Sequence, residues 1–157
     1  MTWVGRAIRR LEDPALITGQ GRFTADFPAA HWVRFVRSTV AAGKLTAIRP
    51  PHGATVITAA DLKGVKKITP MLHKFGYKPV GQPALAEDFV RFTGEPVAAV
   101  VAASEEQAED IADQVGLSID ETKSVIDARA ALAAGAPQIH PEATGNIIIE
   151  GKVTTPG

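Results

Sequence analysis

The sequence FTGEPVAAVVAAS (residues 92–104) contains, in order, a turn, an apolar strand and the start of a helix. Gly94 marks the turn, because glycine tolerates the positive φ that tight turns require. Residues 97–103 are all apolar without alternation, as expected of a strand that is covered on both faces. Ser104 and Gln107 then fit a capping box, which predicts that a helix begins directly after the strand.

Short strands and a long loop are predicted before this sequence. Residues 32–37 (WVRFVR) are rich in β-formers, and residues 45–48 (LTAI) are predicted to be the strand that returns beside them. Another strand is expected at 55–57, followed by a helical turn that Thr58 caps. Residues 65–84 contain three prolines and two glycines. They predict a loop that contacts a ligand or partner, because such long loops are uncommon inside compact domains.

Helical periodicity follows the apolar strand. A helix over 105–115 would place apolar residues at i, i+3, i+4 and i+7, counted from Ala108. An alternating strand is expected at 117–120, and Asp127 is expected to cap a second helix that runs to about Ala134. Strands and helices are mixed without regular strand–helix–strand repetition. The sequence therefore predicts an α+β fold, with a mixed sheet and two or three helices, rather than a doubly wound sheet.

Length and composition fit one domain. A chain of 157 residues can bury enough surface to fold without disulfides or bound metals. We expect a single domain over 1–157, with residues 1–30 as an extended N-terminal arm and residues 145–157 as an open C-terminal tail. The 17 Lys and Arg residues balance 17 Asp and Glu residues, which argues against binding to nucleic acid or anionic membranes. The lack of cysteine excludes disulfides and iron–sulfur ligation on this chain.

Two sequence features bear on the compartment. The N-terminus has no apolar h-region, so no signal peptide is expected. The longest apolar run, residues 97–103, is much shorter than the ~20 residues that a membrane span needs. We therefore expect a soluble, cytoplasmic protein.

Two patterns suggest a cofactor or a metal, and both are incomplete. The segment GQG at 19–21 has two glycines of a phosphate loop but lacks the third glycine, a preceding strand and a following helix, so a simple turn is the better interpretation. The four histidines, His31, His52, His73 and His140, have no paired spacing. Ordinary surface or core histidines are therefore the better interpretation than a metal site.

Charged residues offer weak candidates for catalysis or binding. Glu95 is a candidate general acid or base, although a carboxylate in such a turn more often accepts backbone hydrogen bonds. The acidic cluster in 105–113 is most simply a solvated helix face, and the three lysines in 63–67 are most simply a solvated loop. Arg34 and Arg37 could pair with carboxylates of this chain or of a partner. We assign no catalytic, cofactor-binding or metal-binding residue on this chain.

A series of short blocks runs along the chain in a specific order. They are VG (4–5), RLEDP (10–14), TGQGRF (18–23), FVRS (35–38), TAADL (58–62), LA (85–86), VRFTGEPVAAV (90–100), QAED (107–110) and GN (145–146). In this order and spacing they resemble the N-terminal α/β-hammerhead domain of the xanthine dehydrogenase and aldehyde oxidase family. In that family the domain begins the large, molybdopterin-binding subunit.

The chain departs from the family pattern in two ways. After Ser38 the family usually carries a Pro-His-Ala-His-Ala-Arg-like run, whereas this chain has TVAAGK at 39–44 and lacks those histidines. The family's large subunit also runs several times further, and its molybdopterin contacts and catalytic glutamate lie in the later domains. The resemblance therefore carries no catalytic, cofactor-binding or metal-binding residue over to this chain.

The resemblance implies a non-catalytic hammerhead domain, or a split subunit, that assembles the large subunit around the molybdenum site. It implies no cofactor on this chain, molybdopterin on the remaining large-subunit domains, and iron–sulfur clusters and FAD on partner subunits. The implied chemistry is hydroxylation of an aldehyde or N-heterocycle with oxygen from water. The alternative is a free-standing interaction module of the same fold without enzyme activity. A small hydrolase that uses Glu95 and one histidine would need a pocket that the sequence does not show.

Overall fold

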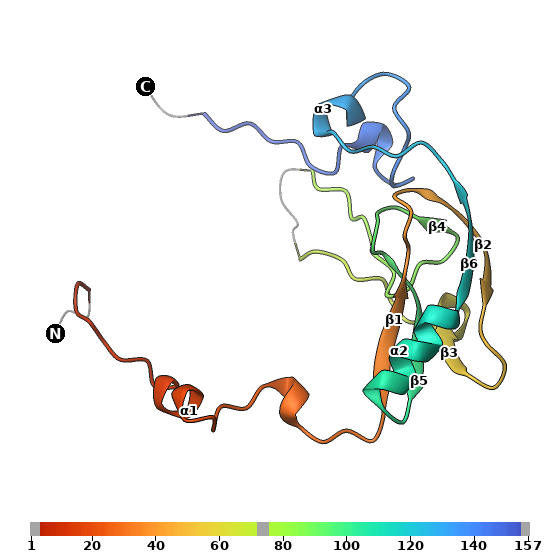
Figure 1. Ribbon diagram of the computed structural model, residues 1–157. Helices are drawn as coiled ribbons and strands as arrows, with labels where there is room; N and C mark the ends of the chain where they lie inside the picture. The colour runs from red at the N-terminus through yellow and green to blue at the C-terminus, as the bar shows by residue number, and fades with distance from the viewer. Residues whose placement is uncertain (1–3, 72–75, 155–157) are drawn as a thin grey trace. The chain divides into compact units, whose positions relative to one another are not determined.

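The computed structural model describes residues 4–71 and 76–154, which fall into two units, 1–30 and 31–157 (Figure 1). His73 lies outside the described residues. The elements are α1 Asp13–Ile17, a 3₁₀ turn Thr24–Asp26, β1 Trp32–Arg37, β2 Gly43–Arg49, β3 Thr55–Thr58, a 3₁₀ turn Ala59–Leu62, β4 Phe89–Val90, β5 Pro96–Ala102, α2 Glu105–Gln114, β6 Gly116–Glu121, α3 Ala128–Ala131 and a 3₁₀ turn Thr144–Asn146. No helix in the described ranges is long and apolar enough to span a bilayer.

The first unit contains one short helix, α1, which was not predicted from the sequence. Pro14 lies in its first turn, where proline costs no intrahelical hydrogen bond. The backbone N–H groups of Gln20 and Gly21 both donate to Ala15 O, at 2.8 and 2.9 Å, and so close the end of the helix. None of the described residues of this unit, 4–30, is buried, and Leu11 is 98% exposed, so these residues form no core of their own. The extended-arm assignment of 1–30 stays a prediction.

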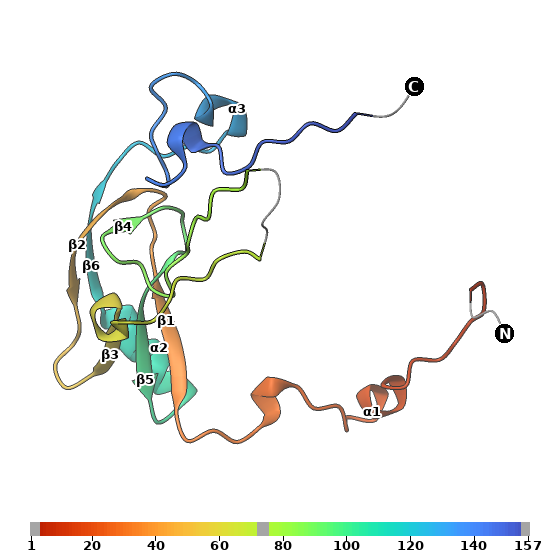
Figure 2. The same cartoon turned by 180° about the vertical axis from the view of Figure 1, so that it is seen from behind.

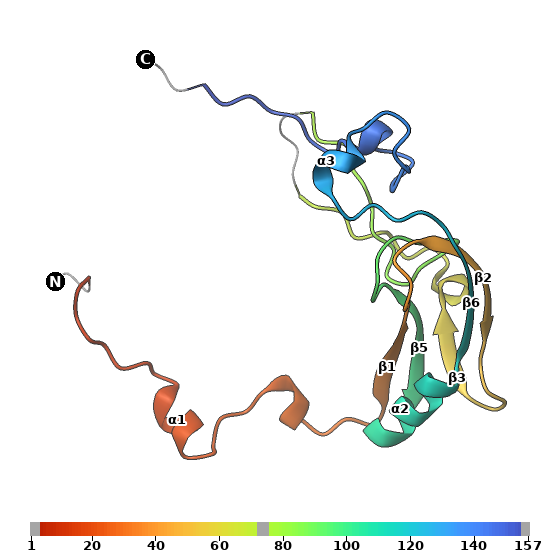
Figure 3. The same cartoon turned by 45° about the horizontal axis from the view of Figure 1, so that its top comes forward.

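The second unit contains two three-stranded sheets. β5 lies between β1 and β3 in one sheet, and β2 lies between β4 and β6 in the other (Figure 3). All four strand pairings in these sheets are antiparallel. The α+β class is thus confirmed, while two antiparallel sheets take the place of the expected mixed sheet.

One predicted strand pairing was wrong. Residues 45–48 lie in β2, which pairs with β4 and β6, whereas β1 pairs with β5. The chain changes sheets between β1 and β2 because distant segments hold the connection. Ser38 N–H donates to Glu95 O at 2.9 Å, and Thr122 N–H donates to Ala42 O at 3.0 Å. These bonds join residues far apart in the sequence, so local patterns could not indicate them.

The unbroken apolar sequence of β5 is explained by burial on both faces. Val97, Ala98 and Val100 are each 0% exposed. On one face Ala98 and Val100 pack with Val36 and with α2, which lies against β1 and β5 (Figure 2). On the other face Val97 packs with Val90 and with side chains of β2 and β6. A strand covered on both faces reads as continuously apolar even in an antiparallel sheet.

Helix α2 begins where the sequence predicts. Ser104 Oγ accepts a hydrogen bond from Gln107 N–H at 3.2 Å. Gln107 Oε1 accepts from Ala103 N–H at 3.2 Å, one residue before the position that a capping box uses. Ala108 and Ala112 are buried, which confirms the predicted apolar face. Cap and apolar face together fix both the start and the orientation of this helix.

The second predicted helix is capped as expected but shorter. Asp127 Oδ1 accepts from Ala130 N–H at 2.7 Å, yet α3 ends at Ala131 instead of near Ala134. Leu132 and Ala133 donate to carbonyls three residues back, so the α-helical ladder gives way to 3₁₀-type bonds. The local cap could be predicted, but the length of the helix could not.

The remaining local predictions agree with the structure, with one difference at a cap. The strands expected at 55–57 and 117–120 lie within β3 and β6. Thr58 precedes the 3₁₀ turn, but its hydroxyl donates to Asp61 Oδ2 at 2.9 Å, so Asp61 is the acceptor there. The described part of 65–84 is irregular apart from one bridge that joins Ile68 to Gln82.

Candidate functional site

A pocket of about 500 Å³ lies between the described part of the loop 65–84 (residues 65–71 and 76–84) and the segment 137–148, and it is the candidate site of this chain. Its lining includes the apolar side chains of Ile68, Val80, Phe92, Ile139 and Ile148 and the polar side chains of Tyr77, Gln82, Arg91, Glu95 and His140. An apolar cavity with a few convergent polar groups is the usual form of a binding site. A groove of about 700 Å³ along β1 and α2 is larger, but its lining includes the charged side chains of Arg34, Arg37 and Asp113.

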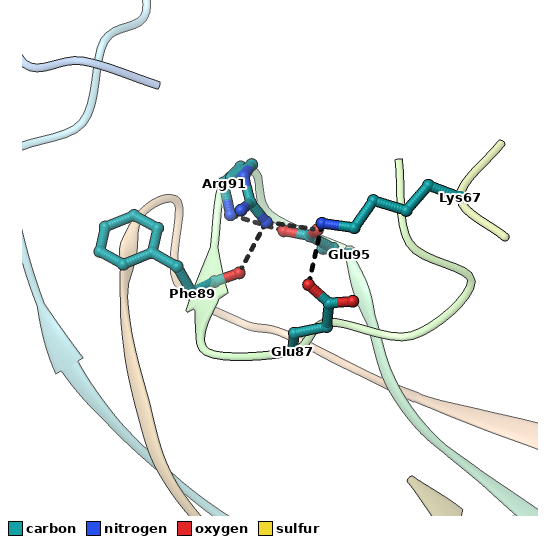
Figure 4. Close-up of polar contacts among 5 residues, drawn as sticks. All are labelled: Lys67, Glu87, Phe89, Arg91 and Glu95. Atoms are coloured by element: carbon teal, nitrogen blue, oxygen red, sulfur yellow. Dashed lines mark hydrogen bonds and ion pairs between the residues drawn. The ribbon is translucent and has the colours of Figure 1, made fainter. Parts of the chain in front are cut away.

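Glu95 lines the pocket and belongs to a network of polar contacts beside it (Figure 4). Its side chain is 2% exposed and accepts a hydrogen bond from Arg91 N–H. Arg91 Nη1 lies 3.7 Å from Glu95 Oε1 and donates to Phe89 O at 3.0 Å. The preferred sequence interpretation, a carboxylate that accepts a backbone hydrogen bond, is confirmed.

The arginine of this pair is less completely satisfied than the carboxylate. Arg91 has a side chain that is 17% exposed, and its Nε has no hydrogen-bond partner among the described residues. Buried polar atoms are normally paired, and here the guanidinium is compensated by the Glu95 carboxylate 3.7 Å away and by its hydrogen bond to Phe89 O. The guanidinium charge is therefore already committed within the chain.

A second ion pair joins the loop to the residues before β4 (Figure 4). Lys67 Nζ lies 2.9 Å from Glu87 Oε2, and both side chains are 40% or more exposed. Exposed pairs stabilise a fold by at most ~1 kcal/mol. Next to it, the backbone groups of Ile68 and Gln82 exchange two hydrogen bonds of 2.8 and 2.9 Å. These contacts give one wall of the pocket a defined position.

Asn146 organises the opposite wall of the pocket. Its φ is +58°, a region that asparagine enters more readily than other non-glycine residues. Its Oδ1 accepts from Ile139 N–H at 2.9 Å, and its Nδ2 donates to Ala131 O at 3.0 Å and to Pro137 O at 2.9 Å. In the sequence, Asn146 is marked only by the GN block, and this structural role was not predicted because tertiary contacts create it.

His140 presents a neutral imidazole to the pocket. Burial lowers the pKa of His140 below 6.5, the Arg91 charge lowers it further, and Glu142 and Glu95 oppose these effects. The lowered pKa keeps the ring uncharged at pH 7. With Arg91 paired to Glu95, the lining of the pocket carries no uncompensated charge.

Neither His31 nor His52 lines this pocket, and the glycine pair at 19–21 forms an ordinary turn. His31 and His52 are exposed, and among the residues with defined placement no three His, Asp or Glu side chains are grouped to hold a metal. The N–H groups of the GQG segment 19–21 donate to Leu16 O and Ala15 O. Because a phosphate loop needs these groups free, the structure agrees with the simple-turn interpretation.

The charged residues of β1 and α2 form surface contacts. Arg34 Nη2 lies 2.9 Å from Glu109 Oε1, which settles the pairing of Arg34 within this chain. Arg37 donates to Gly94 O at 2.9 Å and lies 5.6 Å from the centre of the Phe35 ring. The acidic residues of α2 are exposed, as the solvated-face interpretation expects.

The fold and sequence together identify the class of protein. Residues 18–123 match the family model described as aldehyde oxidase and xanthine dehydrogenase, a/b hammerhead domain. The chain belongs to this family, and the resemblance inferred from the sequence blocks is confirmed.

Curated relatives carry the same segment within longer chains. The large subunit of nicotine 6-hydroxylase from Paenarthrobacter nicotinovorans is 33% identical over 96% of this chain and 20% of its own length. A probable xanthine dehydrogenase subunit from Bacillus subtilis (strain 168) is 28% identical over 84% of this chain and 18% of its own length. The chain thus spans about a fifth of the length of these relatives.

Solved structures show the same fold. The aldehyde oxidoreductase from Desulfovibrio gigas superposes with a TM-score of 0.76 at 29% identity, over 85% of this chain and 16% of that one. Quinoline 2-oxidoreductase from Pseudomonas putida 86 gives a TM-score of 0.75 at 32% identity, over 86% of this chain and 18% of that one. The chain is therefore a hammerhead domain in structure as well as in sequence.

The pocket does not fit the molybdopterin that the family implies. Such a cofactor carries phosphate, which proteins hold with free cationic side chains or backbone N–H groups. In the pocket the guanidinium of Arg91 is paired with Glu95, and the remaining lining is largely apolar. We derive no step through this cofactor on the pocket residues.

Proposed function

We propose that this chain serves as a non-catalytic hammerhead domain, or split subunit, that assembles the large subunit of a molybdopterin-dependent hydroxylase around its molybdenum site. The complete enzyme would hydroxylate an aldehyde or N-heterocycle and pass electrons to iron–sulfur and FAD subunits in the cytoplasm. The family match over residues 18–123 carries this proposal. Relatives whose names specify nicotine 6-hydroxylase and quinoline 2-oxidoreductase support the N-heterocycle class.

The architecture supports an assembling role rather than a catalytic one. The buried carboxylate that lies beside the pocket, Glu95, is engaged with Arg91, and the pocket does not fit the cofactor. The polar groups of the pocket therefore stabilise the domain itself. We place the catalytic centre and its cofactors on the remaining polypeptide.

Affinity purification of the tagged chain from its native host, followed by metal analysis and mass spectrometry, tests the proposal. We expect molybdenum together with a polypeptide that aligns with the remaining four-fifths of the large-subunit relatives. A metal-free monomer, reproduced under gentle lysis, would contradict the proposal. That result would favour the alternative, a free-standing interaction module of the same fold.

A further inference from the structure

We propose that the pocket between 65–84 and 137–148 is the surface through which the domain docks onto the rest of its large subunit. It receives an uncharged, bulky apolar side chain from a segment of the large-subunit polypeptide outside this chain. This inference rests on the proposed function, because it names the surface and the chemistry of that partner. It assigns a binding site to a domain for which no other site has been proposed.

The charges of the lining select an uncharged occupant. Arg91 is paired with Glu95, and the neighbouring Lys67 is paired with Glu87. His140 is flanked by Arg91, Glu95 and Glu142, and burial disfavours its charged form. A charged occupant would lose its hydration and find no free counter-charge, which makes its burial costly.

The exposed apolar rim of the pocket, rather than its volume, favours a polypeptide over a free small molecule. A cavity of about 500 Å³ accommodates a large side chain with part of its backbone. The rim of the cavity is apolar and exposed, because Ile68 and Phe92, which line it, are 66% and 45% exposed, and Ile149, which follows the lining residue Ile148, is 43% exposed. Exposed large apolar residues at the rim of a cavity are typical of protein–protein contacts. About four-fifths of the length of the relatives lies outside this chain and can supply the segment.

The pocket is held in shape before any partner binds. The Ile68–Gln82 bridge fixes one wall, and Asn146 fixes the other through Ile139. Lys78 N–H also donates to Ile148 O at 2.9 Å, which ties the two walls together. Preorganised anchor pockets lose little conformational freedom on binding and concentrate the binding energy in a few residues.

The test compares aspartate substitutions inside and outside the pocket. The purified chain, as wild type, Ile68→Asp or Phe92→Asp, is titrated with the large-subunit polypeptide that co-purifies with it, identified by mass spectrometry. Ile126→Asp is the matched control, because Ile126 is 93% exposed and does not line the pocket. Urea unfolding of each variant checks that the fold is intact, and Ile68→Ala provides a milder second variant.

We expect Ile68→Asp and Phe92→Asp to weaken binding at least about 30-fold, while Ile126→Asp binds like the wild type. Equal binding by all variants would overturn the proposal that the pocket is the docking surface, but it would leave the proposed function unaffected. No binding by the wild type to that polypeptide would overturn both. Self-association of the chain that Ile68→Asp abolishes would identify a second copy as the occupant and overturn the proposal. Indole is a neutral aromatic probe of the pocket. If indole still binds once the partner is bound, the partner does not fill the pocket, and this result would also overturn the proposal.

Discussion

The β1–β5–β3 sheet with α2 and the two irregular segments around the pocket are held together by different forces. In the sheet, β5 contributes three side chains that are fully buried, and they pack on both faces. Around the pocket, the side chain of Glu95 binds a backbone group four residues away, that of Asn146 binds backbone groups seven to fifteen residues away, and few side chains are buried. The sheet is stabilised by many apolar packing contacts, whereas the walls of the pocket are held by a few specific hydrogen bonds and ion pairs.

This difference separates stability from function in the domain. A packed apolar sheet tolerates conservative change because its energy is spread over many contacts. Walls held by single polar side chains can keep their backbone conformation while leaving apolar surface open to a partner. The following predictions test whether the two regions respond as differently as their contacts imply.

The largest effect is expected at Glu95, which lines the pocket and directly precedes β5. Glu95→Ala leaves the largely buried Arg91 charge and the Arg91 N–H without their acceptor. We expect a loss of about 3 kcal/mol in the free energy of unfolding, because removing one partner of a buried pair strands the other. Urea denaturation monitored by circular dichroism measures it.

Glu95→Gln is the control for this substitution. The amide oxygen can still accept from Arg91 N–H but loses the charge interaction, so a smaller loss is expected. Equal stability of the wild type and Glu95→Ala would show that the buried pair does not support the sheet.

Asn146→Ala should loosen the pocket and leave the sheet intact. Three hydrogen bonds are lost, and alanine must adopt a φ of +58°. We expect a local cost of about 2 kcal/mol. Hydrogen exchange should therefore accelerate over 131–146 while β5 keeps its protection. Asn146→Gly restores the backbone freedom but not the bonds, and it should recover only part of the loss. Uniform acceleration across β5 would contradict two separable regions.

Two valines, one in β5 and one in the pocket wall, allow the same substitution to be made in both regions. Val100 is 0% exposed in β5, whereas Val80 is half-buried in the pocket wall. Val100→Ala should cost about 1.5 kcal/mol through lost burial and a residual cavity, and Val80→Ala less than about 0.5 kcal/mol. Parallel urea titrations measure both. Similar losses at the two sites would mean that the pocket wall is packed as tightly as the sheet.

The same difference explains what the sequence could predict. The strand over 97–103, the cap at Ser104 and the apolar face of α2 depend on residues close together in the chain, and all were correctly predicted. Periodicity and capping are local, so they can be recognised without knowledge of the fold. The sequence blocks also led correctly to the hammerhead family.

The parts that were missed depend on distant contacts. The assignment of β2 to a separate sheet follows from bonds that link Ser38 to Glu95 and Ala42 to Thr122. The pocket was also not foreseen, because its walls come from segments about sixty residues apart and Asn146 joins one of them. No local pattern marks an asparagine whose partners lie up to 15 residues away.

The smallest expected effect is a pH dependence that belongs to the pocket alone. Because the folded chain lowers the pKa of His140, the unfolded chain binds a proton more readily once the pH falls below about 6.5. Stability that is fully present above pH 6.5 is therefore lost as the pH falls from there toward the lowered pKa. His140→Gln should reduce the loss of unfolding free energy between pH 7.5 and 5.5, by less than about 1 kcal/mol. Urea unfolding at the two pH values measures it, with the exposed His52→Gln as control. If His140→Gln and His52→Gln change this loss equally, the pocket does not lower the pKa of His140, and the imidazole would then take up a proton at a higher pH than its burial implies, which adds a charge that a docking apolar side chain must bury.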